Sequence, residues 1–181
     1  AIDPSDIKQG KIGNCYFLSS IASLCEFPNL IYQIFINKEI NKFGYYELVL
    51  FIDGKFQIVI LDDYFPVLKG TNIVYFARPN KNELWVMLLE KAWAKVNGGY
   101  SNIISGWPCE ALSTLTGFST SKVVFSKSNI DDIWYEIKVA DNSNSILCIS
   151  SKNDKECEYH GIVRNHSYTL IDTLEIEKGE N

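Results

Sequence analysis

Two strand-like runs joined by a two-residue turn constrain the fold of this chain more than any other feature. The runs are Tyr46–Ile52 and Lys55–Ile60, with Asp53 and Gly54 between them. Alternation of apolar and polar residues is typical of a half-buried β-strand. Asp-Gly favours a type I′ turn, because both of its central residues need positive φ. We therefore predict an antiparallel hairpin here, and a third strand over Ile73–Phe76.

Helical patterns flank the predicted hairpin. One helix should begin at Asn14-Cys15, where Asn is a good N-cap, run to about Glu26 and stop at Pro28. A second helix is predicted from about Glu83 to Val96. The first half of this second helix is apolar on every face, so we expect it to be buried.

The pattern changes after Gly117. An amphipathic helix is predicted around Ile130–Ile137, followed by strands at Ile146–Ile149 and Tyr168–Ile171. A helix-rich part followed by a strand-rich part favours an α+β fold with two lobes, which we place at residues 1–118 and 119–181. Nothing after Asp172 completes the second lobe, so we expect the sequence to be cut from a longer one.

Composition limits the classes of function. With 46% hydrophobic residues in 181, the chain can bury a core. It has no apolar stretch of the roughly 20 residues that a transmembrane helix needs, and no signal peptide at its start. A net charge of −5 without a Lys/Arg cluster argues against nucleic-acid binding. Five irregularly spaced cysteines predict free thiols in a reducing compartment, and hence a soluble, cytoplasmic protein.

One cysteine has the sequence position of a nucleophile. Cys15 lies in the first turn of a predicted helix, where the positive end of the helix dipole favours the nucleophilic thiolate. A free cysteine is more often a small buried apolar residue. We expect that ordinary role for the others, which fall within elements or in loops: Cys25, Cys109, Cys148 and Cys157.

A nucleophilic cysteine needs a base, normally histidine. His166 lies about 150 residues after Cys15, as in papain-like enzymes, and directly precedes a strand-like run. His160 lies in the polar stretch Lys155–His160, which we predict to be a surface loop. With Cys157 it could form half of a zinc site, but the chain has no second ligand pair. His166 is therefore the predicted base.

Four segments resemble the calpain family of cysteine proteases. Gln9–Leu18 is similar to the nucleophile segment of calpains, and Asp62–Pro66 to the turn after their hairpin. Leu88–Gly98 is similar to their LLEKAYAKVNG helix, and His166–Tyr168 to the segment that holds their base. The segments occur in family order and cover nearly the whole chain. The resemblance implies a papain-like fold and a calcium-dependent intracellular endopeptidase that cleaves protein or peptide substrates through a thioester.

The resemblance also implies residue roles. Cys15 corresponds to the nucleophile, His166 to the base and Gln9 to a donor of the oxyanion hole. Asp6 and Glu83 correspond to two carboxylates of a calcium (Ca2+) site in the first lobe. The backbone carbonyl ligands of that site would lie at or before the first residue.

Ser105 and Gly106 correspond to the Gly-Gly pair with which calpains bind substrate main chain. Bulky Trp107 follows them, so we expect a narrower cleft on that side. Calpains carry Asp before the cysteine, Trp after it and Gly before the histidine. This chain has other residues at those positions: Asn14, Tyr16 and Asn165.

The third triad member of calpains, an asparagine in an N-P-W segment, has no counterpart before the chain ends at Asn181. We therefore expect residues 1–181 alone to be weakly active or inactive, and the full-length parent to carry flanking calpain domains. The alternative function is a calpain-like module that no longer cleaves and acts as a calcium-responsive binding or regulatory domain. Joint retention of Gln9, Cys15 and His166 argues against it.

Overall fold

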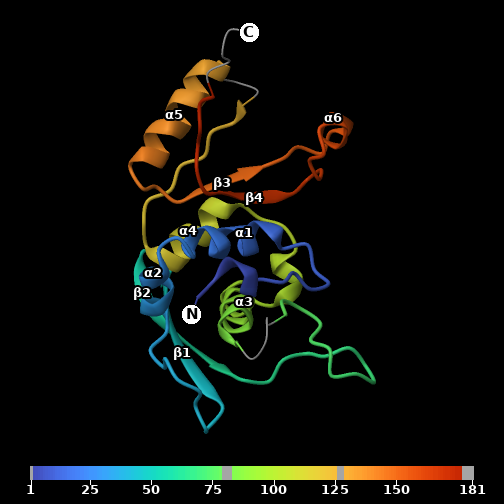
Figure 1. The fold of residues 1–181 in the computed structure, drawn as a ribbon. Helices are drawn as coiled ribbons and strands as arrows, with labels where there is room; N and C mark the ends of the chain where they lie inside the picture. Colours follow the sequence, from blue (N-terminus) through green and yellow to red (C-terminus); the bar gives the residue numbers. More distant parts are fainter. Residues whose placement is uncertain (1, 79–82, 126–128, 177–181) are drawn as a thin grey trace.

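A β-hairpin forms one side of the first part of the molecule. The computed structural model describes residues 2–78, 83–125 and 129–176 (Figure 1). Strands β1 (Tyr45–Ile52) and β2 (Lys55–Asp62) pair antiparallel, with Ile52 opposite Lys55. Asp53 and Gly54 join them at φ values of 52° and 76°. The predicted hairpin and its positive-φ turn are confirmed.

Helices cover the inner face of this hairpin. In chain order the helical elements of the first part are the 3-10 turn η1 (Pro4–Asp6), α1 (Cys15–Leu24), α2 (Pro28–Ile34), α3 (Trp85–Val96), the 3-10 turn η2 (Tyr100–Ile103) and α4 (Pro108–Thr116). Of these, α2, α3 and α4 contact the strands of the hairpin. Phe17 of α1 stacks on Trp93 of α3, with ring centroids 5.5 Å apart. Most of α3 is buried, as its apolar sequence predicts. No helix among the described residues is both long and apolar enough to cross a membrane.

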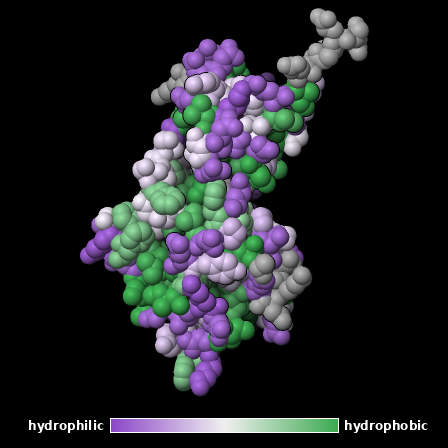
Figure 2. All heavy atoms as spheres, turned by 60° about the vertical axis from the view of Figure 1, so that its left-hand side comes forward, coloured by the Kyte–Doolittle hydropathy of each residue, from purple (hydrophilic) through white to green (hydrophobic). Residues whose placement is uncertain are grey.

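The outer face of the hairpin is apolar and uncovered by the described residues. Phe56, Ile58 and Ile60 of β2 are each more than half exposed, whereas Val59 and Leu61 point into the core. In Figure 2 hydrophobic atoms also reach the surface on both the lower and the upper part of the molecule. The alternation of β2 therefore separates a core face from an outer face that is also apolar.

The second part of the molecule rests on α1. It comprises α5 (Ile130–Asn142), β3 (Leu147–Ser150), α6 (Lys155–Tyr159) and β4 (Ser167–Leu170). Strands β3 and β4 pair antiparallel, and both contact α1. The Thr169 hydroxyl donates to the Ser19 carbonyl at 3.0 Å. Helix α1 therefore packs against α2 and α4 of the first part and also against the β3–β4 pair (Figure 1). The α+β fold is confirmed.

The predicted third strand at Ile73–Phe76 is wrong. Within the described part of the chain, its ladder contact is limited to an isolated bridge between Val67 and Val74. The segment divides its backbone hydrogen bonds between two neighbours, because Tyr75 N–H donates to the Pro66 carbonyl while its own carbonyl accepts from Lys11 N–H. A segment shared in this way forms no continuous ladder.

Other boundaries also differ from the prediction. Helix α1 ends at Leu24, and Pro28 is the first residue of α2, a position where its missing N–H removes no helix hydrogen bond. The predicted loop at Lys155–His160 contains the short helix α6, capped by Asp154, whose side chain accepts from Glu156 N–H. Helix α4 had no prediction at all.

Candidate active site

Cys15 is the first residue of α1 and is half-buried. The carbonyl of Asn14 accepts the first helical hydrogen bonds, from Phe17 and Leu18. The N–H groups at the start of a helix have no acceptor within the helix. The backbone N–H of Cys15 is therefore oriented to donate to an anion at this end of α1, where the helix dipole also favours negative charge.

Asn14 does not cap α1 with its side chain, contrary to the prediction. The side chain is fully buried, and its Nδ2 donates to Glu90 Oε1 at 2.6 Å. Glu90 Oε2 accepts from the backbone N–H of Ala77 at 2.8 Å. Burial raises the pKa of the Glu90 carboxyl, and these two hydrogen bonds oppose the rise. The inward turn of Asn14 follows from the need of this carboxylate for donors.

Glu90 was missed in the sequence. The sequence feature that could have found it is one acidic residue within the apolar stretch of α3, a helix that is buried around nearly its whole circumference. A carboxylate there requires hydrogen-bond donors, since burying an unpaired charge is costly. The sequence does not say which donors these are.

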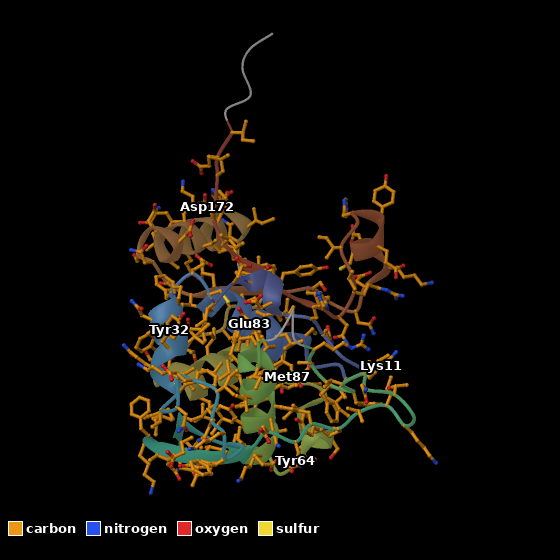
Figure 3. All side chains as sticks on the ribbon, turned by 60° about the horizontal axis from the view of Figure 1, so that its bottom comes forward. Lys11, Tyr32, Tyr64, Glu83, Met87 and Asp172 are labelled. Carbon is orange, nitrogen blue, oxygen red and sulfur yellow. The ribbon has the colours of Figure 1, made fainter. Side chains whose placement is uncertain are left out.

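Gln9 lies in an exposed loop that is held from both sides. Its Nε2 donates to the Ile12 carbonyl at 2.8 Å. Lys8 accepts from Arg78 N–H at 2.9 Å, and Lys11 N–H donates to the Tyr75 carbonyl at 3.0 Å. The predicted oxyanion residue therefore sits between two backbone hydrogen bonds to a single neighbouring segment. Lys11 marks the loop in Figure 3, on the same side of the molecule as α6.

Ser105 and Gly106 follow η2 and are exposed. A Cβ on Gly106 would lie 2.6 Å from Cζ of Tyr16, so only glycine fits against this ring. The Tyr16 hydroxyl donates to the Ile103 carbonyl at 3.3 Å and accepts from Trp93 Nε1 at 3.0 Å. Tyr16, directly after Cys15, thus holds the predicted substrate-binding segment beside the start of α1.

His166 directly precedes β4 and is half-buried. Its backbone is held by Ser151, whose hydroxyl accepts from His166 N–H at 3.0 Å and whose N–H donates to the His166 carbonyl at 2.9 Å. The imidazole packs edge-to-face on Tyr168, with centroids 4.9 Å apart. Asn165 has a φ of 49°, which explains how it replaces the glycine of calpains, since Asn tolerates this left-handed region.

The structure brings the start of α1 and the start of β4 to the same side of the molecule (Figure 1). The contact between α1 and β4 fixes this arrangement, through Ser19 and Thr169. Among the described residues, however, no hydrogen bond joins Cys15 Sγ to the His166 ring. The predicted pair is therefore on adjoining elements but not in direct hydrogen-bond contact.

Asp6 and Glu83 converge on one indole. Trp85 Nε1 donates to Asp6 Oδ2 at 3.4 Å and to Glu83 Oε2 at 3.0 Å. Asp6 is buried, whereas Glu83 precedes α3 near the centre of the view in Figure 3. Calcium takes about six to eight oxygen ligands. Two neighbouring carboxylates fit part of such a set, and the described residues contain no group of three or more potential ligand side chains.

Of the other four cysteines, Cys109 departs from the expectation that they lie within elements or in loops. Cys109 is the second residue of α4 and half-buried, so it too lies in a first helical turn. Burial raises the pKa of Cys25 to about 12 and also raises that of Cys148. A helix start therefore does not single out Cys15. Helix α1, which begins at Cys15, differs from α4 in that it follows the Gln9 loop in the chain and has extensive contact with β4, the strand after His166.

Comparison with known proteins identifies the family of this chain. The sequence profile of the family described as "Calpain family cysteine protease" matches residues 1–181. "Calpain-type cysteine protease ADL1" of Oryza sativa subsp. japonica is 30% identical over 185 residues, covering 98% of this chain and 8% of the rice protein. "Calpain-A" of Drosophila melanogaster is 31% identical over 172 residues, covering 91% of this chain and 20% of the fly protein.

"Calpain-12" of Homo sapiens is 29% identical over 181 residues, covering 97% of this chain and 25% of the human protein. The chain thus spans a quarter or less of the length of these relatives. The family profile, in contrast, covers the chain from end to end. Since the profile matches over the whole length and the relatives are about 30% identical, the chain belongs to the calpain family of cysteine proteases.

Proposed function

We propose that this protein is a calcium-dependent intracellular cysteine endopeptidase. The observation that carries the proposal is the contact of α1, which begins at Cys15, with β4, which follows His166. Membership of the calpain family supports it. Cys15 attacks the carbonyl carbon of a peptide bond, and His166 accepts the thiol proton and passes it to the leaving amine. Water then hydrolyses the thioester and releases Cys15.

Gln9 and the backbone of Cys15 form the proposed oxyanion hole. A glutamine amide carries two N–H donors, and Gln9 uses one of them on the Ile12 carbonyl. The second donor and the Cys15 N–H are available to the oxygen that becomes negative during attack. A donor of this kind contributes about 3–4 kcal/mol to transition-state stabilisation.

Ser105 and Gly106 are the proposed contacts to substrate main chain. Their position beside Tyr16 supports this role, since Tyr16 directly follows the nucleophile. Trp107 comes next and is half exposed, with the Lys122 ammonium 3.2 Å from its ring centroid. We propose that this cation–π pair narrows the cleft and favours small side chains in the substrate there.

Asp6 and Glu83 are the proposed protein ligands for calcium. Both are oxygen donors of the hard type that this ion prefers. Calcium would neutralise the two carboxylates and thereby tie η1 to the start of α3. The shared hydrogen bond to Trp85 supports the pairing.

The division into lobes at 1–118 and 119–181, a cytoplasmic location and flanking domains are further parts of the proposal. Five free cysteines support a reducing compartment, and the greater length of the relatives supports additional domains. We expect residues 1–181 alone to turn over peptides slowly. In the serine-protease triad, disabling the residue that orients the base costs about 10⁴-fold in kcat.

Thiol reactivity in the natural full-length protein tests the proposal, with Cys109 as an internal control. Cys109 shares the half-buried helix start of Cys15 but follows no oxyanion loop. After brief iodoacetamide treatment at mildly acidic pH, mass mapping should find Cys15 labelled first. His166→Ala should slow labelling of Cys15 alone, and His160→Ala should slow neither thiol.

Equal labelling of Cys15 and Cys109 would contradict the assignment of the nucleophile. Peptide turnover provides the second readout. His166→Ala should lower it by about 10²-fold or more, the usual contribution of a general base. A reactive Cys15 without any peptide turnover would instead favour the binding or regulatory module.

A further inference from the structure

One buried carboxylate connects the two halves of the proposed oxyanion hole. Glu90 is 1% exposed and lies in the middle of α3. Its Oε1 accepts from the side chain of Asn14, the residue directly before Cys15. Its Oε2 accepts from the backbone N–H of Ala77, in the segment that runs beside the Gln9 loop. The two oxygens thus hold two segments that are far apart in the sequence.

The hydrogen bond from Asn14 to Glu90 fixes the position of the first proposed oxyanion-hole donor, the backbone N–H of Cys15. Asn14 is the N-cap of α1, and its carbonyl accepts the first hydrogen bonds of the helix, from Phe17 and Leu18. Its side chain is fully buried, and the 2.6 Å hydrogen bond to Glu90 fixes it to α3. The backbone N–H of Cys15 is therefore set in place by a residue whose side chain is anchored at Glu90.

The hydrogen bond from Ala77 to Glu90 fixes the segment beside the second proposed oxyanion-hole donor, the Gln9 side-chain amide. Ala77 is fully buried, and the residues on either side of it are fixed as well. Phe76 stacks on Tyr100 with centroids 3.6 Å apart, and Arg78 N–H donates to the Lys8 carbonyl. Lys8 directly precedes Gln9. The position of the Gln9 loop therefore depends on a segment that Glu90 anchors.

We propose that Glu90 is a positioning residue that sets the distance between the Cys15 backbone N–H and the Gln9 side chain. This inference rests on the proposed protease function. Glu90 touches neither substrate nor reacting atom. A carboxylate suits the role, because Asn14 Nδ2 donates to one of its oxygens and the Ala77 N–H donates to the other. An apolar side chain of similar size would leave both donors buried without an acceptor.

Glutamine can replace Glu90 in this network, and methionine cannot. Asn14 Oδ1 is buried and has no hydrogen-bond partner. In Glu90→Gln, the new oxygen would accept from Ala77 N–H, and the new amide would donate to Asn14 Oδ1 after rotation of the Asn14 amide. Glu90→Met fills a similar volume but accepts from neither group. The pair of variants therefore separates hydrogen bonding from packing.

The test compares two reactions of Cys15 in the natural full-length protein. Peptide hydrolysis needs the oxyanion hole, whereas alkylation by iodoacetamide displaces iodide and forms no oxyanion. Glu90→Met should lower kcat by about 10- to 100-fold with KM little changed, since mispositioning by about 1 Å costs on the order of 10²-fold. The rate of Cys15 alkylation should stay within a few-fold of wild type. Glu90→Gln should restore most of kcat.

Leu89→Ala is the matched control, because Leu89 is also fully buried on α3 and contacts no part of the site through a hydrogen bond. It should lower the melting temperature and leave kcat near wild type. If Glu90→Met fails to fold, Asn14→Leu removes one of the two donors and should give a smaller loss of kcat. Equal kcat for wild type and the Glu90→Met or Asn14→Leu variant would overturn the inference.

A loss of kcat by Leu89→Ala as large as that by Glu90→Met would also overturn it, because general destabilisation would then explain both. Parallel loss of turnover and of Cys15 alkylation would show damage to the nucleophile instead of the oxyanion hole. A wild-type protein that alkylates but never hydrolyses peptides would contradict the proposed function itself. The two failures are therefore distinguishable.

Discussion

Replacing Gly10 by alanine should shift the Gln9 loop and little else. A Cβ at this position would lie 1.9 Å from the Phe76 carbonyl oxygen and 2.2 Å from its carbon. Restoring a separation of 3.0 Å requires a retreat of about 1.1 Å. Phe76 cannot supply it, because its ring is stacked on Tyr100 and the next residue is bound to Glu90. The loop that carries Gln9 must move instead.

The expected effect on catalysis follows from that displacement. Moving a transition-state donor by about 1 Å costs on the order of 10²-fold in rate, or about 2.7 kcal/mol in activation free energy. We therefore expect Gly10→Ala to lower kcat by about 100-fold while KM changes by only a few-fold. Cys15 alkylation should be nearly unaffected, since Asn14 anchors the start of α1 independently of this loop.

A fluorogenic peptide assay with saturating calcium, on the natural full-length protein, measures kcat and KM. Gly70→Ala is the control: its φ of 77° makes alanine unfavourable through backbone conformation alone, because a Cβ there meets nothing within 4 Å. The control should lower the melting temperature without lowering kcat. Unchanged kcat in Gly10→Ala would refute the placement of Gln9 in the oxyanion hole. An equal loss of kcat and of the rate of Cys15 alkylation in Gly10→Ala would refute it as well.

Three further predictions concern calcium, pH and backbone conformation. Calcium should change the fluorescence of Trp85, whose indole touches both proposed ligands, and Glu83→Ala should weaken calcium binding in calorimetry; identical titrations of wild type and variant would remove Glu83 as a ligand. The hydrogen bond from Lys91 lowers the pKa of Asp62, so the ionised form stabilises the fold above the unfolded pKa of about 3.8, and this stability is lost as pH falls through the lower folded value. The Asp62 side chain is 60% exposed, so solvent screens the pair and it contributes less than about 1 kcal/mol; Asp62→Asn should only slightly flatten the acid limb of a denaturation curve, and a large shift would contradict this. At Asn165, φ is 49°, so Asn165→Val should destabilise the protein by about 1–2 kcal/mol in urea titrations and Asn165→Gly should not; equal stability of the two would contradict the left-handed conformation.

Local sequence patterns predicted the elements whose form depends on near neighbours. The turn at Asp53-Gly54 joins the strands that its chemistry indicates, because positive φ at adjacent residues is a property of those residues themselves. Burial of α3 followed from its apolar circumference. Pro28 shows the limit of such patterns, since the same residue type can follow one helix or begin the next.

Two of the family-like segments meet through a contact that no local pattern indicates. Lys91 of α3 donates to the Asp62 carbonyl and carboxylate and to the Tyr64 carbonyl. Nearly 30 residues separate these partners in the chain, and Figure 3 labels Tyr64 at the far end of α3 from Glu83. Resemblance located both segments, but their joint role in holding the hairpin to α3 came from the packing.

The sequence by itself determined the hairpin, the buried α3 and two candidate chemical groups, a cysteine near a helix start and a histidine before a strand. Tertiary structure added what distinguishes two similar helix starts, because Cys15 and Cys109 both lie in a first helical turn and α1, which begins at Cys15, has extensive contact with β4. It also turned Asn14 away from its capping role. The physical reason is that Glu90, 76 residues away, is buried and must find hydrogen-bond donors from whichever elements the fold packs around it.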